Sequence, residues 1–393
     1  MTRAVAPGAA AISVIVPTYN RARYIGECLA SLLAQTVPAL EILVIDDGSD
    51  DDTARIVNAF GPRVTYVHQE NAGKARAVNH GLALARGDWI WIMDDDDVAL
   101  PQANQHRLAA LATAPDAGFV YGPHHLGTDG TDGKVLRGRL VQPPPVDAAH
   151  FFLTLMKSCF FHLGTTLVRR EHYQSLNGLD PALHRGQDYD FQIRLARIAR
   201  PACCAEPAFV FRQHAGVRGP KATRHDARHR SAVFMRYSQA IGLKLRADVP
   251  LGEYLVPAQP ADSSAGPSSP QARAGALLNR MEVMGNHGCV SELLQDLEAL
   301  LQLRAGSGQP LLPADREGIA RAMCAGWAYE ASELGRPAWL AQAARLKRHA
   351  GGPAALRALA AGVFTLARSY PGRLAARLAK ARLAWRLVWA SVG

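Results

Sequence analysis

Residues 89–97 read WIWIMDDDD, an apolar run that ends in four consecutive aspartates. A short apolar run of this kind predicts a strand that is buried on both faces of a sheet. The same arrangement occurs twice before it, because residues 12–20 read ISVIVPTYN and residues 41–49 read EILVIDDGS. Residues 64–67, VTYV, predict one more short strand. Four apolar strands, three of them followed by polar residues, therefore organise the first hundred residues.

Helical segments separate these strands. They are predicted over Arg23–Ala34, Asp52–Phe60 and Lys74–Arg86. The alternation of strands and helices predicts an α/β fold with a parallel, doubly wound sheet. Ligands of such sheets bind beyond the carboxyl ends of the strands. The polar residues at 18–20, 46–47 and 94–97 should therefore line one crevice.

The length and composition suit a folded protein of two domains. The chain has 393 residues, of which 48% are hydrophobic and 20% are charged. Residues 256–272 are rich in Pro, Ser and Ala and read as a linker, and the sequence beyond them is helical and rich in Ala and Leu. We therefore predict an α/β domain over residues 1–245, a linker over 246–272 and an all-α region over 273–393.

The four aspartates at 94–97 are the most informative feature. Clustered carboxylates repel one another, and a divalent cation relieves that repulsion. Hard oxygen ligands suit Mg²⁺ or Mn²⁺. An isolated run of this kind would be a solvated acidic loop, but the buried strand before it directs the run to the crevice. The sequence therefore favours a metal site that also faces substrate phosphates.

Residues 185–190, RGQDYD, offer a separate carboxylate. Asp188 follows a glycine at the start of a predicted helix, where an aspartate commonly caps the helix. A carboxylate placed there could instead accept a proton from a hydroxyl group that attacks a substrate. On the position of Asp188 alone, the capping role is the ordinary explanation.

Five segments in order resemble one known family. They are VPTYN at 16–20, VIDDGSDDDT at 44–53, NAGKARAVN at 71–79, MDDDDV at 93–98, and GLD at 178–180 followed by GQD at 186–188. Together they resemble the inverting glycosyltransferase family 2, which has the nucleotide-sugar-binding GT-A fold. The resemblance covers about residues 11–215 and says nothing of the C-terminal region.

The resemblance implies a set of nucleotide contacts. Pro17 and Tyr19, with the adjoining Thr18 and Asn20, would line the base pocket, and Asp47 would contact the nucleobase. Gly73 and Arg76 would lie beside the nucleotide, with Lys74 as an alternative to Arg76. Asp94 and Asp95 would lie near the ribose and the diphosphate.

The resemblance also implies a metal site and a catalytic base. Asp96 would be a direct ligand of Mg²⁺ or Mn²⁺, although four consecutive aspartates leave the register open by one residue. His214 resembles a family histidine near the metal, and a structural role for it stays open. Asp188 would deprotonate the acceptor hydroxyl. The family usually has Glu before this aspartate, and Gln187 stands there instead, which leaves the acceptor open.

The implied partners are a nucleotide sugar, by family habit a UDP-sugar, and a glycan or lipid-linked acceptor, with no nucleic acid. Two other functions stay open. A nucleotidyltransferase would also have a doubly wound sheet, but it favours a Gly-rich basic loop after the first strand. A non-catalytic glycan- or nucleotide-binding module would explain Gln187 as a trace of lost activity.

The C-terminal tail is basic. Eleven Lys and Arg residues and no acidic residue follow Glu333, in a chain whose net charge is +10. A tryptophan-containing amphipathic helix over residues 373–389 would suit an anionic membrane surface, or it would pack on its own domain. We find no apolar run of spanning length and no CxxC pair, so we expect a cytoplasmic protein, with contact at the inner face of the membrane through residues 370–393.

Overall fold

The computed structural model describes residues 11–214, 230–255, 269–324, 337–369 and 386–388. The chain divides into two compact units. The first unit comprises Met1–Ala148 and Cys159–Arg224, and the second comprises Ala149–Ser158 and His225–Gly393.

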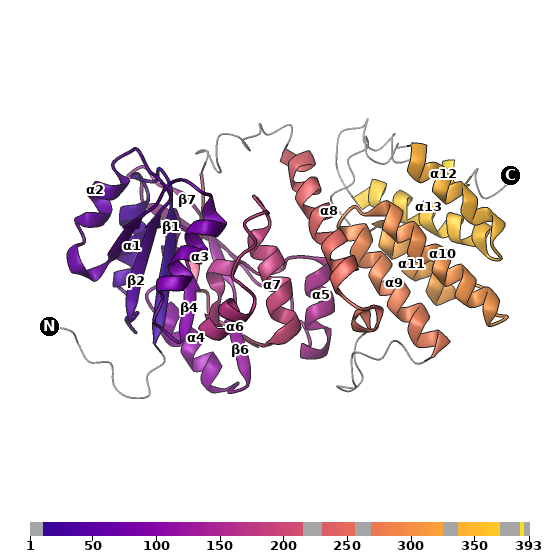
Figure 1. The fold of residues 1–393 in the computed structure, drawn as a ribbon, viewed down its shortest axis with the longest axis horizontal. Coiled ribbons are helices and arrows are strands. Elements are labelled where there is room, and N and C mark those ends of the chain that lie inside the picture. Colours follow the sequence, from indigo (N-terminus) through magenta and orange to yellow (C-terminus); the bar gives the residue numbers. More distant parts are fainter. Residues whose placement is uncertain (1–10, 215–229, 256–268, 325–336, 370–385, 389–393) are drawn as a thin grey trace. The chain divides into compact units, whose positions relative to one another are not determined.

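The first unit is built on a large sheet (Figure 1). Within the described residues, this sheet has seven strands in the order β10-β6-β9-β4-β1-β2-β3. They are β1 (Ile12–Thr18), β2 (Glu41–Asp46), β3 (Thr65–His68), β4 (Trp89–Ile92), β6 (Ala117–Tyr121), β9 (Leu167–Arg169) and β10 (Arg200–Cys203). β1 pairs in parallel with β2 and β4, and β2 pairs in parallel with β3. The four strands predicted from the sequence are therefore present, and the α/β fold class is confirmed.

Strand β9 differs from the prediction of a parallel sheet, because it runs antiparallel to both β4 and β6. The chain enters β9 directly from the 3₁₀ turn η3 (Leu163–Thr165). Between the end of β6 and the start of β9 the chain forms β7, β8 and α5, and it re-enters the sheet at the edge that it left, so β9 runs antiparallel. The sheet is therefore mixed, and the loop before β9 lies at the edge where β1, β2 and β4 end.

Helices pack on both faces of this sheet. They are α1 (Ile25–Leu33), α2 (Thr53–Asn58), α3 (Lys74–Leu84), α4 (Ala103–Ala112), α6 (Arg170–Ser175) and α7 (Gln187–Ile198), with the 3₁₀ turn η1 (Gly61–Arg63). On β1, Val14 and Val16 belong to a buried cluster that includes residues of α1. Ile15 points to the opposite face and contacts Gly81 of α3. The strand is therefore apolar at every position because both of its faces are covered.

A smaller sheet adjoins the acidic run. In the described part of the chain it has the order β5-β11-β7-β8. Its strands are β5 (Val98–Ala99), β7 (His124–Asp129), β8 (Val135–Val141) and β11 (Phe209–Gln213). β5 begins directly after Asp97 and pairs antiparallel with β11. This pairing brings the chain around His214 to the four aspartates.

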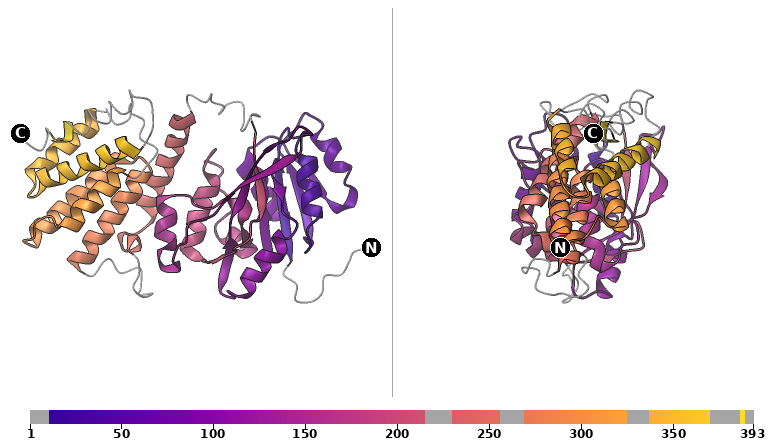
Figure 2. Two further views of the ribbon diagram at one scale, coloured as in Figure 1. Left: turned by 180° about the vertical axis from the view of Figure 1, so that it is seen from behind. Right: turned by 90° about the vertical axis from the view of Figure 1, so that its right-hand side faces the viewer.

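The second unit is helical, as the sequence predicts for the C-terminal region. Its described elements are α5 (Phe151–Lys157), α8 (Arg230–Asp248), α9 (Pro270–Asn286), α10 (Val290–Gly306), α11 (Pro313–Cys324), α12 (Pro337–Arg345) and α13 (Gly352–Ser369), with the turns η2 (Ala148–His150) leading into α5, η5 (Leu251–Tyr254) and η6 (Leu346–Arg348). Helix α9 packs against α10 and α11, and α11 packs against α13 (Figures 1 and 2). Helix α5 belongs to this unit although both of its neighbours in sequence belong to the first.

Buried ion pairs fix the helices of this unit. The carboxylate of Asp296 accepts from Arg246 at 2.6 Å and from Arg280 at 2.6 and 3.0 Å. Arg304 and Asp315, both buried, form two bonds of 2.8 Å. Such paired charges are stable in an interior only while both partners are present.

Two sequence predictions concern regions that the structure describes only in part. The segment that was predicted as a linker contains the end of α8, η5 and the start of α9, and its residues 256–268 lie outside the described residues. The predicted basic helix at 373–389 also lies outside them, apart from residues 386–388. None of the helices described here has both the length and the apolar character that a membrane span requires.

Candidate functional site

The loops after β1 and β2 are joined to each other. Thr18 lies opposite Asp46 in the parallel ladder, and Asp47 N donates to Thr18 O at 2.8 Å. Asn20 adopts a left-handed backbone with φ of 53°. Its side chain donates to Asp50 Oδ1 at 2.6 Å and accepts from Asp50 N at 2.9 Å. Asn20 therefore ties the two loops together, while Pro17 lies opposite Ile45 in the ladder and Tyr19 is half-buried.

Asp47 organises the loop that precedes α3. Its carboxylate is 4% exposed and accepts three hydrogen bonds of 2.8 Å, from Ala72 N, Gly73 N and Gln69 Nε2. The neighbouring Asp46 accepts from Ser49 N and Tyr66 Oη at 2.8 and 2.7 Å. Asp47, which the resemblance places against the nucleobase, thus already holds the backbone of Gly73 with its carboxylate.

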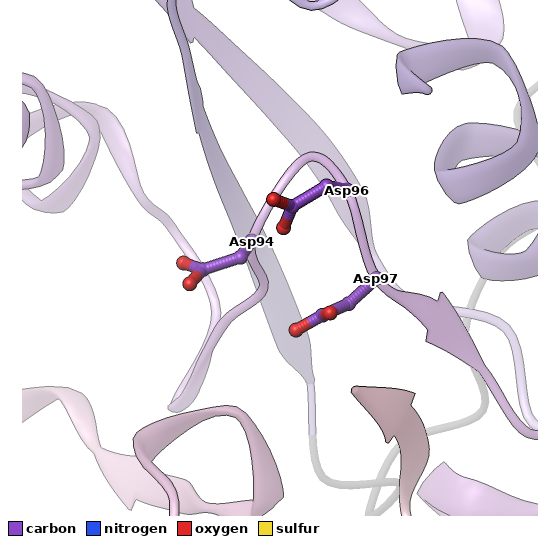
Figure 3. Close-up of side chains that lie close together, drawn as sticks. All are labelled: Asp94, Asp96 and Asp97. Carbon is purple, nitrogen blue, oxygen red and sulfur yellow. The ribbon is translucent and has the colours of Figure 1, made fainter. Parts of the chain in front are cut away.

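The acidic run forms a cluster at the end of β4. Figure 3 shows Asp94, Asp96 and Asp97 on the turn that follows this strand. One carboxylate oxygen from each lies within 4.8 Å of the others. Asp95 lies outside this group, and its Oδ1 is 3.4 Å from Arg21 Nε. Burial, and then the carboxylate of Asp96, raise the pKa of Asp95 to about 7.

Each member of the cluster has a partner. Asp94 Oδ1 is 2.5 Å from Lys74 Nζ, and Asp96 Oδ2 is 2.8 Å from His214 Nε2. Asp97 is buried and accepts from Arg212 N at 2.9 Å. Of the two candidate cations on α3, Lys74 reaches the acidic run, whereas Arg76 is exposed.

Arg212 holds the acidic run from behind, and the sequence analysis did not identify it. Its side chain is 1% exposed, and its Nε donates to the backbone oxygen of Asp96 at 2.8 Å. Its other nitrogens bind Asp129 Oδ1 at 2.8 Å, Gly133 O at 3.2 Å and the carboxylate of Glu27. Its position two residues before His214 is the one sequence feature that could have drawn attention to Arg212, but such spacing does not predict that an arginine is buried.

The cluster fits a hard divalent cation. Its donors are carboxylate oxygens, which Mg²⁺ and Mn²⁺ prefer. Mg²⁺ binds oxygen at about 2.0–2.1 Å, so that two ligands on opposite sides lie about 4.2 Å apart. The three carboxylates, with one oxygen of each within 4.8 Å of the others, are compatible with that spacing. His214 Nε2 lies 2.8 Å from Asp96 Oδ2 but is not one of the donors grouped within 4.8 Å of one another.

Asp188 lies in the first turn of α7, after Gly186. Gly186 has φ of 73°, a left-handed conformation that glycine adopts without strain. Within the described part of the chain, the half-buried Asp188 carboxylate makes no hydrogen bond or ion pair. Burial lowers the pKa of Lys74, but Asp94 outweighs this effect and Asp188 and Asp96 add to it, so the pKa is raised. Asp188 therefore lies within electrostatic reach of the acidic cluster.

Asn79 and Arg194 fix the segment that leads to Asp188. Asn79, on α3, donates to Leu179 O at 2.8 Å and accepts from Leu179 N at 2.9 Å. Arg194 donates to Gly178 O at 3.0 Å and to Leu176 O at 2.8 Å, and its Nε is 2.8 Å from Asp190 Oδ2. The third and fifth sequence motifs are thus joined through one asparagine, a contact that no local pattern reveals.

Residues 13–176 match the family model described as Glycosyl transferase family 2. This match includes the strand ends, the loop before α3 and the acidic run. The chain carries a glycosyltransferase family 2 domain. The GT-A class expected from the sequence agrees with the parallel order of β4, β1, β2 and β3.

Named relatives are similar over this domain. Glycosyltransferase GlyG of Streptococcus pneumoniae is 45% identical over 127 residues, which are 31% of this chain and 42% of that protein. An uncharacterized glycosyltransferase of Rickettsia felis is 28% identical over 194 residues, which are 48% of this chain and 32% of that protein. This chain spans between 28% and 59% of the length of five such Rickettsia relatives. The domain is thus of the glycosyltransferase type.

A solved structure is also similar to this chain. S. aureus TarS 1–349 in complex with UDP-GlcNAc superimposes with a TM-score of 0.48 and 17% identity, over 80% of this chain and 88% of that one.

Proposed function

We propose that this protein transfers a sugar from a nucleotide-sugar donor to an acceptor hydroxyl group, with inversion at the anomeric carbon. The observation that supports this most is the meeting of Asp94, Asp96, Lys74 and Asp188 in one neighbourhood of a family 2 domain. Metal-binding carboxylates and a separate, unengaged carboxylate are the two parts that such a reaction requires.

The cation would be held by Asp96 with Asp94, Asp97 and His214. A bound Mg²⁺ or Mn²⁺ supplies positive charge that neutralises the leaving diphosphate. Lys74 adds a second positive charge at the same edge. The loop that Asp47 holds, with Pro17, Thr18 and Tyr19, would bind the nucleoside.

Asp188 would act as the general base. The acceptor oxygen forms a bond to the anomeric carbon while the bond from that carbon to the diphosphate oxygen breaks. The proton of the acceptor hydroxyl passes to the Asp188 carboxylate, which makes the acceptor a better nucleophile.

We propose a UDP-sugar as donor and a glycan or lipid-linked acceptor of cell-envelope polysaccharide or glycolipid synthesis. Both proposals rest on the sequence. The motif pattern suggests the donor, and the basic tail at 370–393 suggests a cytoplasmic protein that contacts the inner face of the membrane. Flotation of the full chain on vesicles with anionic lipids tests this membrane contact. A form that ends at Ser369 and floats equally well contradicts it.

An assay of nucleoside diphosphate release tests the reaction. We expect release from one donor of a nucleotide-sugar panel, dependent on Mn²⁺ or Mg²⁺ and reduced by about 10²–10⁴-fold in Asp188→Asn. The matched control is Asp116→Asn. This aspartate is 85% exposed and directly precedes β6, at the end of the sheet opposite to the acidic run. Release of pyrophosphate instead would indicate a nucleotidyltransferase. Binding without any turnover would indicate a non-catalytic module.

A further inference from the structure

The loop before β9 lies beside the acidic run. In the antiparallel ladder, Arg169 lies opposite Trp89 and Val168 lies opposite Ile90. The residues that precede β9 therefore extend toward the carboxyl end of β4, where the aspartates follow. The turn η3 contacts both β4 and α7, the helix that carries Asp188. His162 directly precedes η3, so the topology places it near both the acidic cluster and the proposed base.

The ring of His162 is held in one orientation. Its Nδ1 accepts a hydrogen bond from Gly164 N at 3.1 Å. The ring packs on Phe209 and Phe211 of β11, with centroids 5.3 and 5.1 Å away. Gly164 O in turn accepts from the buried indole nitrogen of Trp91 at 2.8 Å. Strand β4, which carries the acidic run, thus also fixes the loop that orients His162.

Glycine at position 164 allows a close approach of the imidazole. A Cβ atom there would lie 3.1 Å from both His162 Nδ1 and Phe209 Cζ. Such contacts are tighter than usual, so with a side chain at this position one of the two rings would have to shift by a few tenths of an ångström. The close approach is therefore a consequence of glycine and keeps the ring against its backbone donor.

The hydrogen bond decides the role of the second nitrogen. Because Nδ1 accepts from a backbone N–H, the ring hydrogen is on Nε2, which is then a donor. Within the described residues, the bond from Gly164 is the only hydrogen bond of the half-buried ring. Burial lowers the pKa of His162, while Asp94 and Asp188 oppose this effect. The imidazole therefore offers an unengaged Nε2–H near both carboxylates.

We propose that His162 Nε2 donates a hydrogen bond to an oxygen of the sugar that is transferred. The inference rests on the proposed function, in which the diphosphate lies at the acidic cluster and the acceptor hydroxyl lies at Asp188. The anomeric carbon must lie between the leaving and the attacking oxygen, so a donor near both sites faces the sugar ring. A neutral N–H suits a sugar oxygen, whereas Lys74 and the cation serve the phosphates. His162 is thus a residue that selects the donor sugar.

The experiment compares two ligands in the presence of Mn²⁺: UDP, and UDP-N-acetylglucosamine or whichever UDP-sugar stabilises the wild-type protein most. The variants are His162→Leu, which removes the donor, and His162→Gln, which retains an N–H. The control is His106→Leu, on α4, which packs on β6 away from the site. Affinities are measured by titration calorimetry.

In His162→Leu we expect UDP to bind within about twofold of wild type and the UDP-sugar to bind about 3–10-fold more weakly, the effect of one hydrogen bond. His162→Gln should recover most of the loss. Equal loss for both ligands, or no loss for either, overturns the proposal, because a structural histidine would not distinguish them. Failure of wild-type protein to bind any UDP compound would instead contradict the proposed function.

A second measurement serves if His162→Leu does not fold. Wild-type protein and His162→Gln are titrated with UDP-sugars that lack one hydroxyl or amide oxygen at a time. One analogue should bind more weakly to wild type than the parent sugar, and that difference should shrink in His162→Gln. Differences that are the same in both proteins overturn the proposal.

Discussion

Replacing Arg212 by methionine should disorganise the acidic run without touching any aspartate. Methionine fills a similar volume but removes every donor of the guanidinium. Four acceptors then each lose a hydrogen bond: the carboxylates of Glu27 and Asp129 and the backbone oxygens of Asp96 and Gly133. The hydrogen bond to the backbone oxygen of Asp96 matters most for function, because without it the turn that carries the proposed metal ligand is no longer held.

The magnitude follows from the burial of these groups. Removing one partner of a buried ion pair costs about 3–5 kcal/mol, because the other charge is left uncompensated. The Arg212 side chain is 1% exposed, but those of Glu27 and Asp129 are 27% and 21% exposed, so water compensates them in part. We therefore expect a loss of about 3 kcal/mol in the free energy of unfolding.

Urea unfolding of wild type and Arg212→Met measures this loss. Arg304→Met is the control, because it removes an equally buried arginine, which pairs with the buried Asp315 in the helical unit. Arg212→Met should also weaken Mn²⁺-dependent UDP binding by at least tenfold, whereas Arg304→Met should leave it unchanged. A loss below 1 kcal/mol with unchanged UDP binding would refute the reasoning.

Three further predictions test neighbouring contacts. Lys74→Met removes the cation 2.5 Å from Asp94, so calorimetry should show tighter binding of Mn²⁺ alone and weaker binding of UDP; a parallel change in both would contradict it. Asp47→Asn leaves an amide that cannot accept from both Ala72 N and Gly73 N, so denaturation should show a loss of about 2 kcal/mol and UDP affinity should fall; an unchanged affinity speaks against the role of this loop. Burial lowers the pKa of His287, although its hydrogen bonds to Met156 O and Ser238 O oppose this. Since the unfolded chain then binds the proton more readily, stability should fall as pH drops below about 6.5, and His287→Gln should flatten that slope in pH-dependent unfolding; an unchanged slope would count against the assignment.

The strands that organise the site were predictable because their signal is local. In β1, β2 and β4 every residue faces a covered side of the sheet, so a continuous apolar run marks each of them. The polar residues that follow lie at one edge because parallel strands end together. The acidic cluster and its contact with Lys74 are consequences of that edge, whereas His214 reaches Asp96 through the pairing of β5 with β11.

Features that depend on distant pairing were not predictable in the same way. Strand β9 has only three residues, and β8 is half-exposed and carries arginines at 137 and 139, so neither shows an apolar run. Helix α5 has a sequence typical of any amphipathic helix, and its membership of the second unit follows from contacts such as Lys157 with Glu282. Arg212 and His162 acquire their places from β11 pairing and the antiparallel entry of β9.

The partners of the loop residues were equally hidden. Asn20 and Asp47 lie in motifs that imply nucleotide contact, and the structure shows that both also hold loop backbone. A motif records that a residue type is required at a position. It does not say whether the ligand or the neighbouring loop requires it.

The most direct test of the account is the affinity of UDP with and without Mn²⁺, measured by calorimetry on wild type and Asp96→Asn. The account predicts that Mn²⁺ tightens UDP binding by at least tenfold in wild type and that Asp96→Asn abolishes most of this gain. It also predicts that metal-free affinity is similar in the two proteins. Equal UDP affinity in the presence and absence of the ion, or a full gain in Asp96→Asn, would contradict a cation held by the acidic run.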